Sequence, residues 1–424
     1  MKRWSRGAFT LAVAGGAVFG GVGAAALQAD PVTLVWADRF EWPSIGGPVN
    51  WEQTLIDQFE QKYPNIKVVH ELTDETKWVA QIAAGGGPDL LSGCCTVFHD
   101  GGVSGAFLDL TPFLGTTLPD YVKDGTFWPP QMNAFNSNGK QFALPQYLGT
   151  IAEYANVEDF NAAGVAIPSA DLNANTQNWD GFEAMVKKLT QFDASGKVTR
   201  YGIQKGVFGD RSTLYMRAAG AEYYVDGDHS QSALASPEAV AALAFEQRLM
   251  RDDQALTPIE TDWGGSFGNN RAAVLEDGSW NLGSYIGVDA NGKAKVPFQV
   301  SVFPVPIGPS GERPTLTNTD GFAIPKTTKH VKEALLLLEF MVSHETTVFR
   351  AKYLGMQPPR KDVVPEYLDL MESFNHQSYE VNAHVFTDES ANAYPQYFYT
   401  KQTLADTLLT GAEHKIFDDG APVQ

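Results

Sequence analysis

The stretch "VTLVWADRFEWPSIGGPVNWEQTLIDQFEQKYPNIKVVHEL", residues 32–72, decides the fold. It opens on the apolar run VTLVWA, which predicts a buried strand, and closes on IKVVHEL, which predicts a second one. Between them Leu55, Ile56 and Phe59 fall on one face of a helix, preceded by a capping asparagine and ended by a proline. A strand–helix–strand unit of this kind joins two parallel strands through a right-handed crossover.

The pattern continues into a third strand. Residues 73–85 predict a second helix, and the run PDLL, residues 88–91, predicts a short strand. The sheet is then open and of the α/β class, and in such sheets ligands lie beyond the carboxyl ends of the strands. The loops WADRFEW and SGCCTVF leave those ends. We therefore expect their side chains to lie near a ligand.

A second α/β unit follows from about residue 150. Residues 178–192 predict an amphipathic helix, and FDASGKVTRYGI predicts a tight turn into a strand. Residues 236–251 predict a helix that begins with a capping serine and a proline. Further on, VSVFPVPIGPSG predicts a strand, and DGFAIPKTTKHVKEALLLLEFMVSH predicts a strand, a turn and an apolar helix. Two domains fit the length of the chain.

The N-terminus, residues 1–29, has the pattern of a secretory signal peptide. Lys2, Arg3 and Arg6 precede a small, apolar run that ends in the small-residue cleavage motif LQA. A retained membrane anchor is the alternative, but the run is rich in glycine and alanine rather than leucine. We expect an exported protein, periplasmic or extracellular, with no direct membrane insertion.

The composition argues against several kinds of partner and chemistry. The formal net charge is −19, so nucleic acid and anionic lipid are unfavourable partners. The two cysteines are adjacent, the histidines are scattered, and no Gly-Lys-Ser/Thr follows the glycine run. We therefore predict no catalytic residue, no metal site and no cofactor. Acidic residues are numerous, so a secreted carbohydrate-active hydrolase stays open as an alternative.

Seven segments, taken in order, resemble the extracellular solute-binding proteins of carbohydrate ABC transporters, the family that includes maltose-binding protein. They are LVWADRFEW, FEQKYPNIKV with GGGPDLL, FALPQYLGTIAEYANVEDFNAAGVAIP, NWDGFEAMVKKLT, SFGNNRAAVLEDGSWNLGSY, DGFAIPKTTKHVKEALLLLEFM and GMQPPRKDVV. Asn269 and Val274 stand where the family has glycine and methionine. The Cys94-Cys95 pair is not a family feature, and the end of the chain fits the family pattern poorly.

The resemblance implies the two-lobe periplasmic-binding-protein fold (type II). Each lobe would be a mostly parallel sheet flanked by helices, with the ligand cleft between the lobes. The implied parts are an N-terminal lobe over 30–145 and about 298–344, a C-terminal lobe over 150–297 and about 345–424, and hinges near 143–149, 303–309 and 343–347. A monomer of this fold would capture a mono- or oligosaccharide, close around it, and deliver it to the membrane subunits of an ABC permease without catalysis.

The resemblance and the chemistry of sugars together predict the ligand residues. A sugar offers flat C–H faces and a rim of hydroxyls, so its site needs aromatic platforms and polar groups that bond bidentately. Trp280 lies where the family places a stacking tryptophan, and Asp320 lies in a loop that the family often uses for hydroxyls. The expected ligand residues are Trp36, Asp38, Arg39, Trp42, Cys94, Cys95, Gln146, Tyr147, Trp263, Trp280, Asp320, Gly321 and Arg360. Packing is the alternative for Trp36, Tyr147 and Trp280. For Asp320 the alternative is a capping or turn role, and for Arg360 it is pairing with a surface carboxylate.

Two alternatives bear on the chemistry of the ligand. Arg39, Arg217 and Arg360 could converge on a carboxylate or a phosphate, as for a sugar acid or a glycerol phosphate ester. Cys94 and Cys95, on the loop after the third strand, could form a vicinal disulfide that lies as an apolar ledge against a sugar face. The alternative for that pair is two free thiols.

Overall fold

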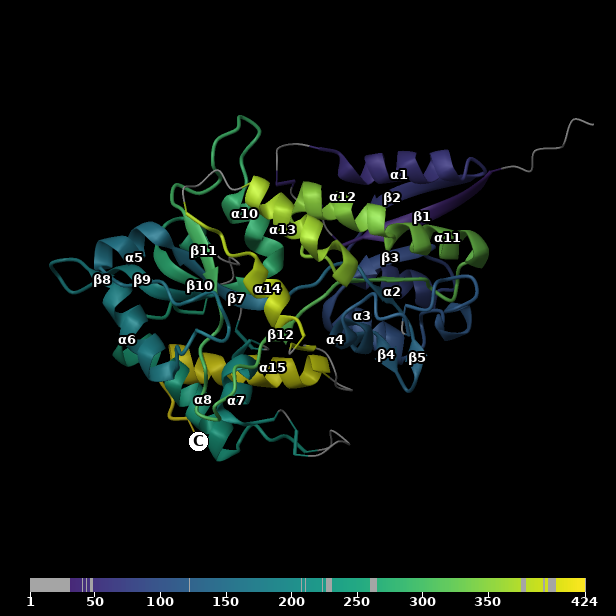
Figure 1. Ribbon diagram of the computed structural model, residues 1–424. Helices are drawn as coiled ribbons and strands as arrows, with labels where there is room; N and C mark the ends of the chain where they lie inside the picture. Colours follow the sequence, from purple (N-terminus) through teal and green to yellow (C-terminus); the bar gives the residue numbers. More distant parts are fainter. Residues whose placement is uncertain are drawn as a thin grey trace, which may run out of the picture.

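Two α/β lobes, each built on a five-stranded sheet, make up the protein (Figure 1). The computed structural model describes residues 31–423 apart from 40, 43, 46–48, 122, 207, 210, 223, 226–230, 260–264, 375–378, 392 and 396–401, and apart from the side chains of 95–97, 395 and 402–406. The predicted signal peptide lies outside the described residues.

The sheet of the first lobe has the strand order β2-β1-β3-β13-β6. Its strands are β1 (Val32–Asp38), β2 (Ile66–Leu72), β3 (Leu90–Gly93), β6 (Leu144–Pro145) and β13 (Gly321–Ala323). β1 pairs in parallel with β2 and with β3, so the prediction from the opening stretch is confirmed. The helices and the accessory hairpin of this lobe are α1 (Trp51–Lys62), α2 (Glu75–Ala83), α3 (Cys95–Val103), α4 (Pro129–Ala134), α11 (Val331–Met341), α12 (His344–Leu354), β4 (Asn136–Ser137) and β5 (Lys140–Gln141).

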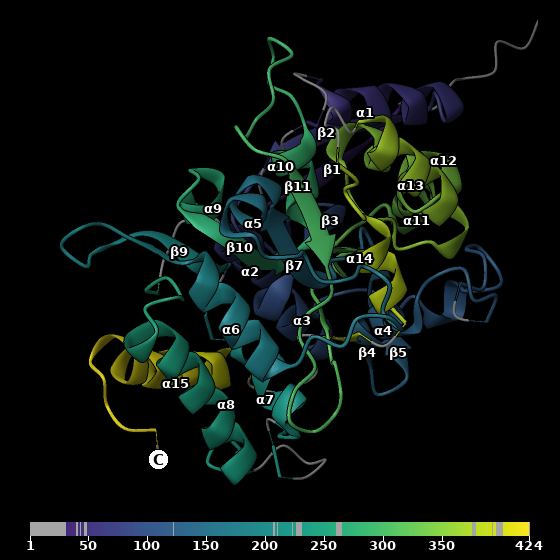
Figure 2. The same cartoon turned by 60° about the vertical axis from the view of Figure 1, so that its left-hand side comes forward.

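The second lobe has the strand order β11-β7-β10-β9-β8. Its strands are β7 (Ile151–Asn156), β8 (Gln191–Phe192), β9 (Val198–Lys205), β10 (Ala272–Gly278) and β11 (Val300–Phe303). Its helices are α5 (Val157–Ala163), α6 (Trp179–Leu189), α7 (Ser212–Ala219), α8 (Pro237–Gln247), α9 (Gly265–Gly268), α10 (Leu282–Ile286) and α15 (Gln402–Glu413). In Figure 2, α6 lies in front of the strands, and α8 and α15 lie below them. The remaining α-helices and strands are α13 (Val364–Ser373), α14 (His384–Glu389), β12 (Leu316–Thr317) and β14 (Tyr394–Pro395).

Both sheets are mixed, which corrects the expectation of mostly parallel ones. β13 runs antiparallel to β3 and β6, and β7 runs antiparallel to β10 and β11. Parallel neighbours need a crossover connection within one sheet. β7 and β13 instead enter their sheets directly from the other lobe, so no crossover helix sets their direction.

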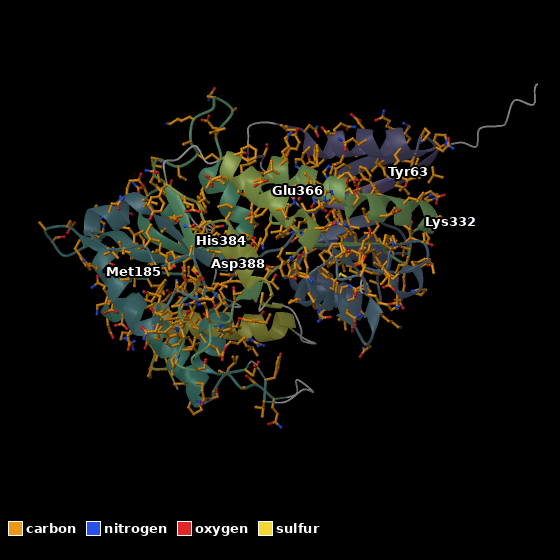
Figure 3. All side chains as sticks on the ribbon, in the orientation of Figure 1. Tyr63, Met185, Lys332, Glu366, His384 and Asp388 are labelled. Atoms are coloured by element: carbon orange, nitrogen blue, oxygen red, sulfur yellow. The ribbon has the colours of Figure 1, made fainter. Side chains whose placement is uncertain are left out.

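Local signals place the helices well, with small errors at their ends. The Asn50 side chain caps α1 by accepting from the backbone N–H of Gln53 at 2.9 Å, and Ser236 caps α8 by accepting from Ala239 at 3.2 Å. The helix expected over 178–192 ends at Leu189, because the chain turns there into β8. Met185 of α6, labelled in Figure 3, is buried in the core of the second lobe.

The lobe boundaries differ from those expected. β11 pairs with β7, so the chain has not returned to the first lobe at residue 298; it returns at β13. Nor is there a crossing near 343–347. α11 and α12 adjoin there, and Leu338 and Leu354 both pack into the core of the first lobe. The chain leaves that core only after α12, since Tyr367 of α13 packs in the same cluster as Tyr154 of β7.

Three segments join the lobes. The first link, residues 146–150, and the second link, residues 304–320, run side by side, and the third crossing lies between α12 and α13. The Asn318 N–H donates to the Gly149 carbonyl at 2.8 Å, and Gln146 N–H donates to the Asp320 carbonyl at 2.7 Å. The hydroxyl of Thr150, on the first link, lies 2.9 Å from that of Ser390, which follows α14. His384 and Asp388 of α14, labelled in Figure 3, contact each other at 2.8 Å. Among the described residues, no helix is both long and apolar enough to cross a membrane.

Candidate functional site

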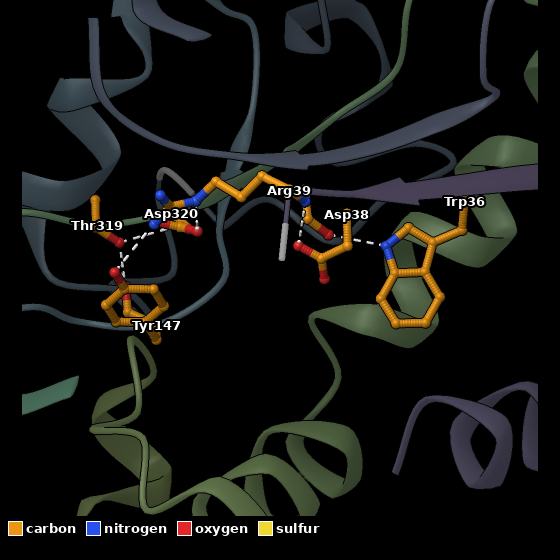
Figure 4. Close-up of polar contacts among 7 residues, drawn as sticks. Trp36, Asp38, Arg39, Tyr147, Thr319 and Asp320 are labelled. Carbon is orange, nitrogen blue, oxygen red and sulfur yellow. Dashed lines mark hydrogen bonds and ion pairs between the residues drawn. The ribbon is translucent and has the colours of Figure 1, made fainter. Parts of the chain in front are cut away.

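A guanidinium–carboxylate pair lies at the edge of the first lobe that faces the links (Figure 4). Arg39 Nε and Nη2 each donate to one oxygen of Asp320 at 3.0 Å, and the Tyr147 hydroxyl donates to Asp320 Oδ1 at 3.1 Å. Arg39 follows β1, and Asp320 directly precedes β13. Because β13 is antiparallel to β3, its amino end lies at the edge where β1 and β3 end. The topology therefore brings together two residues that are 281 positions apart.

Burial makes this cluster electrostatically strong. The Asp320 side chain is fully buried, whereas that of Arg39 keeps 23% of its surface exposed. Behind them lies Asp38, whose pKa is raised to about 8 by burial and by the charge of Asp320. Its Oδ1 accepts the Arg39 backbone N–H at 2.8 Å, and within the described part of the chain its Oδ2 has no hydrogen-bond partner. Burial and the Asp320 charge also raise the pKa of Tyr147.

A row of contacting aromatic side chains extends from this cluster to the second lobe. The Trp42 ring meets Tyr147 edge to face at 5.5 Å between centroids, and Tyr147 meets Trp280 at 6.5 Å. Trp280 lies on the turn that follows β10, is only partly buried, and packs against the cores of both lobes. The Arg39 guanidinium lies 5.9 Å from the Trp42 ring centre. The structure thus brings together Arg39, Trp42, Tyr147, Trp280 and Asp320, five of the expected ligand residues.

The second lobe adds two residues that the sequence analysis missed. Arg211 Nη1 donates to Asp277 Oδ1 at 3.1 Å, and both side chains are buried. The Arg211 guanidinium lies 5.2 Å from the centre of the Trp280 ring. The signal for Asp277 is its place three residues before that tryptophan, in EDGSW. Arg211 carries no comparable signal, because only the fold brings the start of α7 to this turn.

A groove of about 1060 Å³ has walls from both lobes, and of the three aromatic side chains just described Trp42 lines it, whereas Tyr147 and Trp280 do not. On the first lobe it is lined by Trp42, Asn50, His70 and Leu72, among others, and on the second lobe by residues 288–290 and Lys295. Since both lobes contribute walls, its shape depends on how far apart they stand. A small molecule bound there would contact both.

Several expected ligand residues have other roles. Trp36 is fully buried in the first core and donates to Ser92 Oγ at 2.8 Å, because β1 is a central strand covered on both faces. Gly321 serves close packing, since a Cβ there would lie 2.7 Å from the Phe135 ring. Arg360 pairs with Asp362 at 2.7 Å.

The other expected residues are less accessible or lie outside the description. Gln146 is buried on the first link, and its side-chain oxygen and nitrogen have no hydrogen-bond partner within the described part of the chain. Trp263 and the Cys95 side chain lie outside the described residues.

The loop after β3 lies close to the cluster through Glu75. This carboxylate accepts a hydrogen bond from the backbone N–H of Cys94; burial raises its pKa, and it also feels the charges of Arg39 and Asp320. Cys94 is buried and disulfide-bonded, and the only other cysteine of the chain is its neighbour Cys95. This state agrees with the vicinal disulfide that we considered from the sequence.

A thiol titration tests this bond. We expect the denatured but unreduced protein to show no reactive thiol, because both cysteines are held in the bond, and the reduced protein to show two. The assay is a colorimetric thiol reagent in denaturant, with and without prior reduction. Two reactive thiols in the unreduced, monomeric protein would contradict the disulfide.

Comparisons with known proteins agree with the fold. Residues 43–348 match the family model described as bacterial extracellular solute-binding protein. No curated protein sequence matches the chain.

Similar solved structures cover nearly the whole chain. The ABC substrate-binding protein Lmo0181 from Listeria monocytogenes, in complex with cycloalternan, is 19% identical, with 93% of this chain and 95% of that chain covered and a TM-score of 0.75. Maltose-bound MalE3 of T. maritima is 22% identical, with 92% and 96% covered and a TM-score of 0.71. UgpB from Mycobacterium tuberculosis, in complex with glycerophosphocholine, is 18% identical, with 91% and 95% covered and a TM-score of 0.72.

Proposed function

The chain belongs to the family of bacterial extracellular solute-binding proteins, and from this premise we propose that it captures a neutral mono- or oligosaccharide between its lobes for an ABC importer. Proteins of this family bind a solute and catalyse no reaction on it. The bound form would dock on the permease, whose membrane and nucleotide-hydrolysing subunits are separate chains.

The observation that carries the proposal is the pairing of charges beside the aromatic side chains. Arg39 is matched by Asp320, and Arg211 is matched by Asp277. The two ion pairs flank Trp280 and Tyr147 without leaving an excess positive charge. Paired guanidinium and carboxylate groups suit hydroxyls, which both donate and accept, and indole faces suit the C–H faces of a sugar ring. A neutral polyhydroxylated ligand fits this combination.

The same charges count against an anionic ligand. Arg39, Arg217 and Arg360 pair with three different carboxylates, those of Asp320, Glu222 and Asp362. An anion would have to displace a carboxylate from each arginine that it used. Glycerophosphocholine, which is bound by the similar UgpB protein, remains an informative ligand to test.

Capture would proceed by closure of the lobes. Asp320 has four lone-pair positions and uses three of them on Arg39 and Tyr147, which leaves one for a ligand hydroxyl. Arg39 remains partly exposed and can donate to the same ligand. Since Tyr147 belongs to the first link, contacts at this cluster also act on the segment about which the lobes move. Closure excludes water and so strengthens the hydrogen bonds to the ligand.

A thermal-shift screen of the mature protein tests the proposal. The compounds are neutral mono-, di- and trisaccharides, sugar acids, sugar phosphates and glycerophosphocholine. We expect one neutral sugar to raise the unfolding midpoint, since a ligand at a hundredfold excess over its Kd stabilises the folded state by about 2.7 kcal/mol. Calorimetry then measures Kd, and chromatography shows whether the sugar is recovered intact.

Other results have definite meanings. Shifts with anionic compounds alone would replace the neutral sugar by an anionic ligand. No shift with any compound would contradict sugar capture, and recovery of cleaved sugar would favour a hydrolase.

A further inference from the structure

The buried Arg211–Asp277 pair lies next to Trp280, in the second lobe. Arg211 directly precedes α7, and Asp277 is the penultimate residue of β10. Their side chains keep 1% and 0% of their surface exposed, and Nη1 lies 3.1 Å from Oδ1. A pair this deeply buried is geometrically fixed, because any loosening would leave a charge without its partner in a medium of low polarity.

Asp277 also fixes the turn that carries Trp280. Its Oδ1 accepts the backbone N–H of Gly278 at 2.8 Å, and its Oδ2 accepts the side-chain amide of Asn281 at 2.5 Å. These two donors flank the tryptophan in sequence. On the other side the carboxylate lies against Gly206, the residue that follows β9, since a Cβ there would lie 2.8 Å from Asp277 Cγ. One carboxylate thus ties both ends of the turn to the sheet.

The Trp280 ring is bounded on several sides. The Arg211 guanidinium lies 5.2 Å from its centre, and Tyr147 meets it at 6.5 Å. A Cβ at Gly278 or at Gly149 would lie 2.0 Å or 2.8 Å from the ring, so both glycines allow the indole to rest on bare backbone. The ring is nevertheless only partly buried. Its exposed part is the surface left for a ligand.

We propose that Arg211 and Asp277 are positioning residues that set the orientation of Trp280 and thereby select a ligand with a flat, apolar sugar face. The inference rests on the proposed function and deepens it. Arg211 occupies one side of the indole, which restricts the ligand to the remaining surface. The Trp280 ring packs against Gly149, which belongs to the first link. A ligand that displaces the ring would therefore also displace this link between the lobes.

The test removes both charges at once. The double variant Arg211→Met, Asp277→Asn leaves no unpaired charge in the core, so it should fold. We expect its Kd for the sugar found in the screen to rise by about tenfold or more, since the cation beside the indole and part of the tether are lost. We also expect acrylamide to quench Trp280 more strongly. The fluorescence of Trp280 alone is obtained by subtracting the fluorescence of a Trp280→Phe variant from that of its parent, for the wild type and for the double variant separately.

The matched control is Arg217→Met, Glu222→Gln. Arg217 pairs with Glu222 at 2.9 Å and lies 4.1 Å from the centre of the Tyr394 ring, so it offers the same chemistry in a more exposed place. We expect unchanged affinity and unchanged quenching in this variant. If the first double variant fails to fold, Arg211→Lys replaces it, because lysine keeps the charge but loses the planar fork.

The outcomes separate the two proposals. If the wild type binds no sugar, the proposed function fails, while the quenching measurement without ligand still tests the positioning. Wild-type quenching and wild-type affinity in the Arg211→Met, Asp277→Asn variant would overturn the positioning role even if sugar capture stands. Stronger quenching with a raised Kd in this variant, but not in the control, supports it.

Discussion

Replacing Asp320 with alanine is expected to abolish ligand binding and to lower the free energy of unfolding by about 3–5 kcal/mol, the usual loss when one partner of a buried ion pair is removed. The carboxylate is fully buried and receives both arms of the Arg39 fork together with the Tyr147 hydroxyl. Alanine leaves the guanidinium and the hydroxyl without this acceptor. Under the proposed function it also removes the oxygen that would accept a ligand hydroxyl.

A matched control exists at the surface. Arg360 also donates two hydrogen bonds to Asp362, from Nε to Oδ1 at 3.0 Å and from Nη2 to Oδ2 at 2.7 Å. In this pair, however, 48% of the Asp362 side chain is exposed. The Asp362→Ala variant should therefore lose less than about 1 kcal/mol and keep its ligand affinity. Urea denaturation measures the stabilities, and calorimetry measures binding. Equal losses in the two variants would show that burial does not strengthen the Arg39–Asp320 pair.

The second large effect that we expect is a fall in stability as the pH rises from about 5 to about 8.5. Burial is the first cause of the raised pKa of several carboxyl groups, among them four whose pKa reaches about 7 or 8. These four are Asp38 and Glu389, raised to about 8, and Glu276 and Glu413, raised to about 7. Between pH 5 and 8 the folded protein holds protons that the unfolded chain has released. The folded state therefore binds more protons, and stability is lost as the pH rises through these values.

Glu389 gives the clearest test of this effect. It ends α14, and burial outweighs the stabilising effects of Arg313 and Thr315 on its charged form. Glu389→Gln should remove the cost of ionising this group, on the order of 5 kcal/mol for a pKa raised from 4.5 to about 8. We expect the variant to be more stable than the wild type at about pH 8.5 and little changed at about pH 5, as measured by urea denaturation.

The control is Glu372→Gln on α13, an exposed position that loses the same formal charge. It should leave the pH dependence of stability as it is in the wild type. A Glu389→Gln protein with the wild-type pH dependence would show that this carboxyl is not held protonated by burial.

Local sequence patterns determined the strands and helices and the class of the fold. The parallel β1–β2 pair follows from an amphipathic helix between two apolar runs, and the caps Asn50 and Ser236 lie where short polar side chains can satisfy free backbone N–H groups. Such signals depend on neighbours within a few residues. The order of the motifs along the chain also predicted the family of extracellular solute-binding proteins, and residues 43–348 match the model of that family.

The structure gathers five of the expected ligand residues, Arg39, Trp42, Tyr147, Trp280 and Asp320, into one cluster. Their contact with a ligand stays a prediction. The same reasoning was wrong about Trp36. Alternation along a strand cannot tell which side faces a ligand when both faces of the sheet are covered.

Only the tertiary structure decided which charges meet and which strand joins which sheet. Arg39 and Asp320 are 281 residues apart, and Arg211 reaches Asp277 across 66. β11 looks like any short apolar strand in sequence, yet it pairs with β7 rather than with the first sheet. The physical reason is that residue type and spacing encode local backbone preference and burial. The identity of a distant partner depends on how the links fold the two lobes together, and no local pattern records that.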